Sequence, residues 1–109
     1  MDQVKAIEAF AALAQQTRLA IYRLLVREEP TALRASDISA RLNIVPSTLS
    51  GHLAVLRRAG LLKSARHQRE IHYSANIAAM NELVHFMLKD CCNGQIDNCS
   101  EILTLLSPA

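Results

Sequence analysis

Residues 36–60 limit the possible folds more than any other part of the chain, because they hold two short amphipathic segments separated by only three residues. Ser36 is a good helix cap, so the first segment is predicted to be a helix over 36–42. Pro46 favours the start of a second helix over 46–58, and Gly60 stands where a left-handed residue often follows a helix. Two helices joined so closely have to pack against each other at an angle.

The second of these helices has two chemically different faces. Leu49, Leu53 and Leu56 recur at helical spacing and are predicted to point inward. Such a pair of short helices is the helix-turn-helix pattern, in which the second helix enters a DNA groove. Small residues near the start of this helix let DNA approach its backbone. The ordinary alternative for such a polar face is that it only contacts water. The candidate DNA-binding residues on this helix are Ser47, Thr48, Ser50, Gly51, His52, Arg57 and Arg58.

A β-hairpin is predicted after this helix, over residues 61–74. The stretches 61–65 and 71–74 alternate as strands do, around a basic tip at 66–70. A hairpin that follows a DNA-reading helix is a wing, and Arg66 and Arg69 would reach phosphates beside the site that the helix reads. The alternative is a hairpin tip that only contacts water.

The charge distribution agrees with a DNA-binding middle segment. The whole chain has 12 Lys and Arg against 10 Asp and Glu, a formal net charge of +2. Residues 30–74 hold seven basic and two acidic residues, so their net charge is +5 and that of the flanks is −3. A basic segment within a nearly neutral protein suits a phosphate-binding face.

The two ends of the chain predict a dimer. Helices are expected over 3–14, over 18–28 with Thr17 as its cap, and over 77–92 with an almost heptad spacing of apolar residues. The first and last of these offer more apolar surface than one small domain needs, which favours a homodimer over packing within one subunit. The candidate interface residues are Val4, Ile7, Ile77, Met80, Val84 and Met87.

Together these elements predict one domain over residues 1–109, mainly α-helical with a small β-hairpin. No apolar run approaches the about 20 residues of a membrane span, and no secretion signal opens the chain, so we expect a cytoplasmic protein. The sequence has no glycine-rich phosphate loop and no Cys-x-x-Cys pair, so we do not expect an enzyme.

The chain resembles the ArsR/SmtB family of metal- and metalloid-responsive repressors. The resemblance lies in residues 12–19, in the stretch 42–62 that contains Ser47-Thr48-Leu49-Ser50-Gly51-His52-Leu53, and in Tyr73. It implies a dimeric winged helix-turn-helix protein that occupies an inverted-repeat operator and releases the DNA when an ion binds.

Three cysteines near the C-terminus, Cys91, Cys92 and Cys99, form a candidate ion site over 91–99. Thiolates prefer soft ions, and trivalent arsenic or antimony needs only three sulfur ligands, whereas zinc prefers four ligands. The spacing resembles the C-terminal three-cysteine site of an arsenic-responsive branch of the family. The thiol positions of other arsenic sensors, at residues 33–38 here, hold no cysteine, and the isolated His85 does not resemble the family's zinc site.

This comparison predicts a repressor that arsenite, or antimonite, removes from its operator so that arsenic-resistance genes are expressed. Two other readings stay open for the thiols. They are a redox switch that pairs Cys99 with Cys91 or Cys92, and a tail of ordinary thiols. A metalloid-binding protein without operator control is the remaining alternative.

Overall fold

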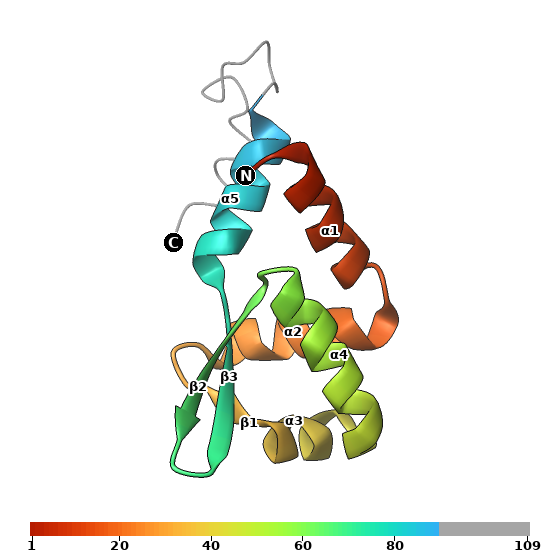
Figure 1. Ribbon diagram of the computed structural model, residues 1–109, viewed down its shortest axis with the longest axis vertical. Helices are drawn as coiled ribbons and strands as arrows, with labels where there is room; N and C mark the ends of the chain where they lie inside the picture. Colours follow the sequence, from red (N-terminus) through yellow and green to blue (C-terminus); the bar gives the residue numbers. More distant parts are fainter. Residues whose placement is uncertain (90–109) are drawn as a thin grey trace.

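The computed structural model describes residues 1–89, so the predictions for Cys91, Cys92, Cys99 and the helix beyond residue 89 lie outside the described part. Five helices and three strands follow one another along the chain (Figure 1). They are α1 (Gln3–Leu13), α2 (Gln16–Glu28), β1 (Leu33–Arg34), α3 (Ala35–Leu42), α4 (Pro46–Arg58), β2 (Leu62–His67), β3 (Glu70–Ala75) and α5 (Ile77–Leu88).

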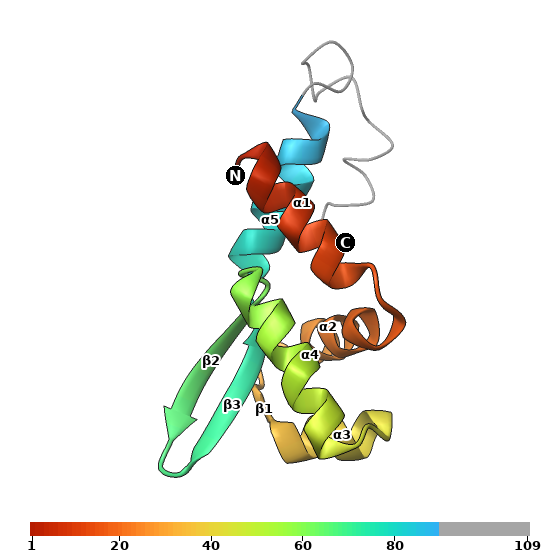
Figure 2. The ribbon, with the colours of Figure 1, turned by 45° about the vertical axis from the view of Figure 1, so that its right-hand side comes forward.

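The elements separate into two regions. α1 and α5 lie side by side at one end of the molecule in both ribbon views, and α2, α3, α4 and the sheet form the other end (Figures 1 and 2). α1 also packs against α2 and α4, which joins the two regions. None of the helices within residues 1–89 is long and apolar enough to cross a membrane.

The sheet has three antiparallel strands in the order β1-β3-β2, so the predicted two-stranded hairpin was incomplete. β1 pairs Leu33 with Tyr73 of β3, and β2 pairs Leu62 with Ala75. β1 has only two residues and gives no alternating pattern of its own. Its pairing with β3 places the start of α3 beside the wing.

The wing has longer strands and a shorter tip than the sequence predicted. Arg66 and Glu70, which we expected in the tip, belong to β2 and β3. The turn consists of Gln68 and Arg69 alone, with Gln68 at φ 61°. Two-residue hairpin turns need such left-handed backbone, which usually calls for glycine or asparagine. The glutamine here is why the turn was not predicted.

Capping and helix-breaking residues determine where the helices begin and end. The bounds of α4 agree with the prediction, and Gly60 has the left-handed φ of 79° that was expected after it. The prediction was wrong for two caps. α2 begins earlier than predicted, because the side chain of Gln15 rather than Thr17 accepts a hydrogen bond from the Arg18 backbone N–H at 2.8 Å. α3 begins at Ala35, before Ser36, so Ser36 is no cap.

The core lies among α2, α3, α4 and the start of the hairpin. Its largest fully buried side chains are Ile21, Leu25, Ile38, Leu49, Leu56 and Leu61. The inward stripe predicted for 46–58 is confirmed, since Leu49, Leu53 and Leu56 are all buried. Each buried leucine of this kind stabilises the fold by about 1.5–3 kcal/mol relative to an exposed one. This packing fixes the inward side of α4 against the rest of the domain.

α1 is packed in the opposite way. Its buried residues are alanines, at positions 6, 9 and 12, and its large apolar residues Val4, Ile7 and Phe10 are exposed. The small alanine side chains let α1 approach its neighbours closely. The larger side chains form an apolar surface on the outside of the protomer.

Candidate DNA-binding surface

The outward face of α4 is polar and accessible. Six of the seven residues predicted on it are exposed, namely Ser47, Thr48, Ser50, Gly51, Arg57 and Arg58, and the seventh, His52, is half-buried. Gly51 has open space around its Cα, so no side chain protrudes from this part of the helix surface. Hydroxyl groups donate and accept hydrogen bonds, and a low surface lets base edges approach the backbone. This face can therefore bind DNA in a major groove.

The start of α4 holds a residue that the sequence reasoning missed. Val45 precedes Pro46 as the N-cap residue of α4, and 63% of it is exposed. Sequence reasoning treated it as part of a connection. An apolar side chain at this end of a DNA-reading helix can contact the methyl group of thymine. Its place directly before the proline-started helix was the signal that could have identified it.

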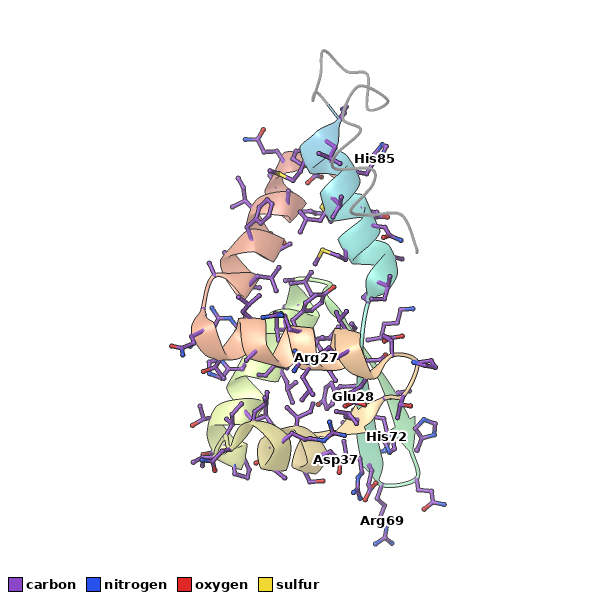
Figure 3. The ribbon with its side chains drawn as sticks, turned by 180° about the vertical axis from the view of Figure 1, so that it is seen from behind. Arg27, Glu28, Asp37, Arg69, His72 and His85 are labelled. Atoms are coloured by element: carbon purple, nitrogen blue, oxygen red, sulfur yellow. The ribbon has the colours of Figure 1, made fainter. Side chains whose placement is uncertain are left out.

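The wing carries the two predicted arginines near its end. Arg66 in β2 donates a hydrogen bond from Nε to the carbonyl oxygen of Gln68 at 3.2 Å, which bends its side chain over the turn. Arg69 lies in the turn and extends away from the hairpin (Figure 3). Both are exposed. The wing tip therefore presents two cations at the end of the molecule opposite α1 and α5.

An ion-pair network joins the wing to the start of α3. Arg34 lies 3.0 Å from an Asp37 carboxylate oxygen and 3.4 Å from an oxygen of Glu70, and Nε2 of His72 lies 3.7 Å from the other Glu70 oxygen. The Arg34 backbone N–H also donates to Asp37 at 3.1 Å. Such exposed pairs contribute little stability singly, but here they connect the helix-turn-helix unit with β3.

These contacts change the titration of Asp37. The hydrogen bonds from the Arg34 side chain and backbone hold the pKa of Asp37 below its usual range. A carboxyl group whose pKa is lower in the folded state stabilises the fold above its unfolded-state pKa. That stabilisation is lost as the pH falls through the lowered value. At neutral pH the Asp37 carboxylate is therefore ionised and keeps its contact with Arg34.

The half-buried His52 has a partner that sequence reasoning also missed. Nη1 of Arg18, at the start of α2, lies 3.5 Å from Nδ1 of His52. Nε of the same arginine donates to the Ala12 carbonyl oxygen in α1 at 2.6 Å. No local sequence pattern links positions 18 and 52, so only the packing of α2 beside α4 could reveal this contact.

The apolar surface predicted for dimerisation is partly exposed on the protomer. Val4 and Ile7 are 66% and 58% exposed, and on α5 Met87 is 58% exposed and Ile77 is also exposed. Val84 is half-buried, and Met80 packs against the core of its own subunit. The exposed residues belong to α1 and α5, two helices that pack against each other. This surface is called the α1–α5 face below.

The described residues offer no site for a metal ion. Within residues 1–89 no group of three or more His, Cys, Asp or Glu side chains is placed to hold one. His85 is exposed on α5 (Figure 3). Any thiol site therefore depends on Cys91, Cys92 and Cys99, which lie outside the described part.

A helix-turn-helix unit with a polar second helix and a basic wing defines a winged helix-turn-helix DNA-binding protein. The family described as "Helix-turn-helix domain" matches residues 13–65. The chain is 36% identical over 87 residues to the transcriptional activator HlyU of Vibrio cholerae, with 77% of this chain and 78% of HlyU covered. It is 31% identical to the transcriptional repressor SdpR of Bacillus subtilis, with 81% and 94% covered.

Solved structures agree with these relatives. An ArsR-like transcriptional regulator from Rhodococcus sp. RHA1 superposes with a TM-score of 0.72 at 25% identity, covering 97% of this chain and 96% of that one. The structure of reduced HlyU from Vibrio cholerae gives a TM-score of 0.61 at 33% identity, with 77% and 88% covered. The chain belongs to the ArsR/SmtB family of transcriptional regulators. Its relatives are DNA-binding regulators rather than enzymes.

Proposed function

We propose that this regulator is a homodimeric repressor that occupies an inverted-repeat operator, and that trivalent arsenic releases it. The observation that carries the DNA-binding part is the presence of two separate surfaces on one protomer, the polar face of α4 and the apolar α1–α5 face. A twofold dimer through the apolar face presents two copies of α4 to two half-sites of DNA.

The inducer part of the proposal rests on thiol chemistry. Cys91 comes three residues after Leu88, the last residue of α5, and Cys92 and Cys99 follow it. Arsenous acid exchanges its three hydroxyl groups for three thiols and releases three waters, and antimonous acid reacts in the same way. Soft thiolate ligands favour such ions over hard cations. A site this close to α5 in sequence would act on the α1–α5 face.

The sign of regulation is proposed as repression. SdpR is a repressor and HlyU an activator, so both signs occur among the relatives. The described residues contain a DNA-binding unit and an apolar face, and a dimer bound to an operator that overlaps the promoter would repress by blocking access to it. A reporter gene behind the chain's own upstream DNA tests this. Deleting the regulator should raise expression, and a fall would indicate an activator.

The proposal is tested by fluorescence anisotropy on a labelled duplex from that upstream DNA, in reducing buffer, while arsenite is titrated. We expect tight binding that collapses with arsenite. An almost complete release requires about 10⁴-fold preference of the ion for the released state. Cys92→Ser should keep DNA binding and lose the response, and His85→Ala on α5 is the matched control that should keep both. An unchanged response in Cys92→Ser contradicts the arsenic site.

A thiol-redox repressor is the second candidate, because one solved relative is described as reduced HlyU, a description that specifies the redox state of that relative. Peroxide would oxidise Cys99 with Cys91 or Cys92 to a disulfide, the two thiols giving up two electrons and two protons as peroxide becomes two waters. Release by peroxide that dithiothreitol reverses, without release by arsenite, would favour it. Arsenite binding without preference for the upstream duplex would instead indicate a metalloid-binding protein without operator control.

A further inference from the structure

Arg18 joins three helices with one side chain. It lies near the start of α2, and its Nε donates to the Ala12 carbonyl oxygen at 2.6 Å. That carbonyl belongs to the last turn of α1, where helix carbonyls lack partners within the helix. The Nη1 atom of the same guanidinium lies 3.5 Å from Nδ1 of His52, in α4. The end of α1 and the DNA-reading helix are therefore held by one planar group.

This contact decides which nitrogen of His52 carries the proton. A guanidinium group can only donate hydrogen bonds, so Nδ1 of His52 has to accept. In the neutral ring the proton then sits on Nε2. His52 is half-buried, and Nδ1 is the ring atom that faces Arg18. The ring thus offers an oriented N–H donor at Nε2.

The position of His52 on α4 indicates what this donor meets. His52 follows the exposed Thr48 by four residues, so both lie on the same side of the helix. That side flanks the face formed by Ser47, Gly51 and Arg58. The centre of a DNA-reading helix meets base edges, and its flanks meet the phosphate backbone. Phosphate oxygens accept hydrogen bonds and carry negative charge, which suits an N–H donor beside a guanidinium.

We propose that Arg18 is a positioning residue for DNA binding, which holds the His52 ring against the end of α1 so that its Nε2–H donates to an operator phosphate. The inference rests on the proposed function only in that α4 binds operator DNA, and it needs neither arsenic nor oxidation. Because α1 also carries Val4 and Ile7 of the α1–α5 face, the same contact ties that face to the DNA-binding surface.

The first test compares Arg18 with Arg23, an exposed arginine on α2. Arg18→Lys keeps the charge but loses the fork that reaches two acceptors at once, and Arg23→Lys makes the same change on another side of α2. Binding is measured without arsenite, on a duplex selected from random sequences by the wild-type protein. We expect Arg18→Lys to weaken binding roughly tenfold or more, and Arg23→Lys to stay within about twofold. Equal effects would overturn the proposal.

The second test reads the ring itself. Nitrogen-15 spectra of the histidine rings distinguish the two neutral tautomers, and wild-type His52 should show the proton on Nε2. In Arg18→Lys the ring should become a mixture of tautomers. Circular dichroism shows whether the variant has kept its helices. If it has not, the nitrogen-15 spectrum of the wild type still shows which tautomer His52 adopts. A proton on Nδ1 in the wild type would overturn the proposal.

The third test locates the DNA acceptor. A glutamine side chain places an N–H donor close to where Nε2 lies, whereas asparagine is too short, so His52→Gln should retain most of the binding that His52→Asn loses. Duplexes with single methylphosphonates should contain one position whose effect disappears in His52→Asn. If 7-deazapurines show that pattern instead, His52 reads a base and the phosphate assignment is wrong.

The outcomes also separate this proposal from the function it rests on. If the wild type bound selected and random duplexes equally, the operator function would fail, while the ring spectrum would still show whether Arg18 orients His52.

Discussion

α1 and α4 are helices of similar length with opposite construction. α4 buries leucines and exposes small polar residues and arginines, whereas α1 buries alanines and exposes Val4, Ile7 and Phe10. Both are amphipathic, so amphipathicity alone does not say which face is the core face. The exposed face of each helix therefore suits a different partner. DNA suits the polar face of α4, and an apolar protein surface suits α1.

The largest effect is expected on the inward face of α4. Leu56→Ala removes a fully buried side chain, and we expect it to lower the free energy of unfolding by about 2–5 kcal/mol. Leu19→Ala, at an exposed leucine of α2, is the matched control and should cost less than about 1 kcal/mol. Chemical denaturation measures both. Similar losses at the two sites would mean that the α4 stripe is not what holds that helix.

The outward face of α1 is tested by its assembly. Val4→Glu places a charge in the α1–α5 face, and we expect dimer dissociation to become roughly 100-fold more favourable, about 2.7 kcal/mol. Val26→Glu makes the same change at an exposed valine of α2. Sedimentation equilibrium compares the two, and circular dichroism monitors folding. A dimer that survives Val4→Glu but not Val26→Glu would move the interface to α2.

The inward face of α1 should reject larger side chains. Ala9 is fully buried, so Ala9→Leu is expected to destabilise the fold by about 1–3 kcal/mol through overpacking. Ala11 on the same helix is exposed, and Ala11→Leu should change stability by at most about 0.5 kcal/mol. Thermal unfolding measures both variants. If Ala9→Leu proved neutral, α1 would not be closely packed on its alanines.

The smallest effect is expected on the outward face of α4. Arg57→Gln removes one exposed charge near the end of the helix, which should weaken binding to all duplexes alike and reduce the salt slope by about 1. Arg27→Gln, on α2, is the control that should leave the slope unchanged. Anisotropy at several salt concentrations gives the slopes. A loss confined to one DNA sequence would assign Arg57 to base reading instead.

Sequence reasoning succeeded where a residue type has one dominant conformational effect. Pro46 and Gly60 allow few alternatives at a helix start and after a helix end, and the predicted bounds of α4 were confirmed. The leucine spacing was equally decisive, because its period matches that of a helix and the opposite side of α4 is polar, which leaves one side to be buried. The exposure of Val4 and Ile7 also agrees with the predicted excess of apolar surface.

Prediction from the sequence failed where the interacting residue lies far away in the chain. β1 is a strand only because Leu33 and Arg34 pair with β3, and two residues carry no period. Met80 of α5 is partly buried against the core of its own subunit, a contact that the heptad-like spacing of this helix does not reveal.

The helix-turn-helix unit, its polar face, the basic wing and the position of three cysteines can all be recognised in the order of the residues. These depend on local conformational preference and on spacing, which the order of residues contains directly. Three features became visible only once the chain was folded, namely that α1 packs on its alanines, that β1 completes the sheet and that Arg18 lies beside His52. Those features arise because packing brings distant segments within hydrogen-bond and van der Waals distance, and no local pattern encodes that distance.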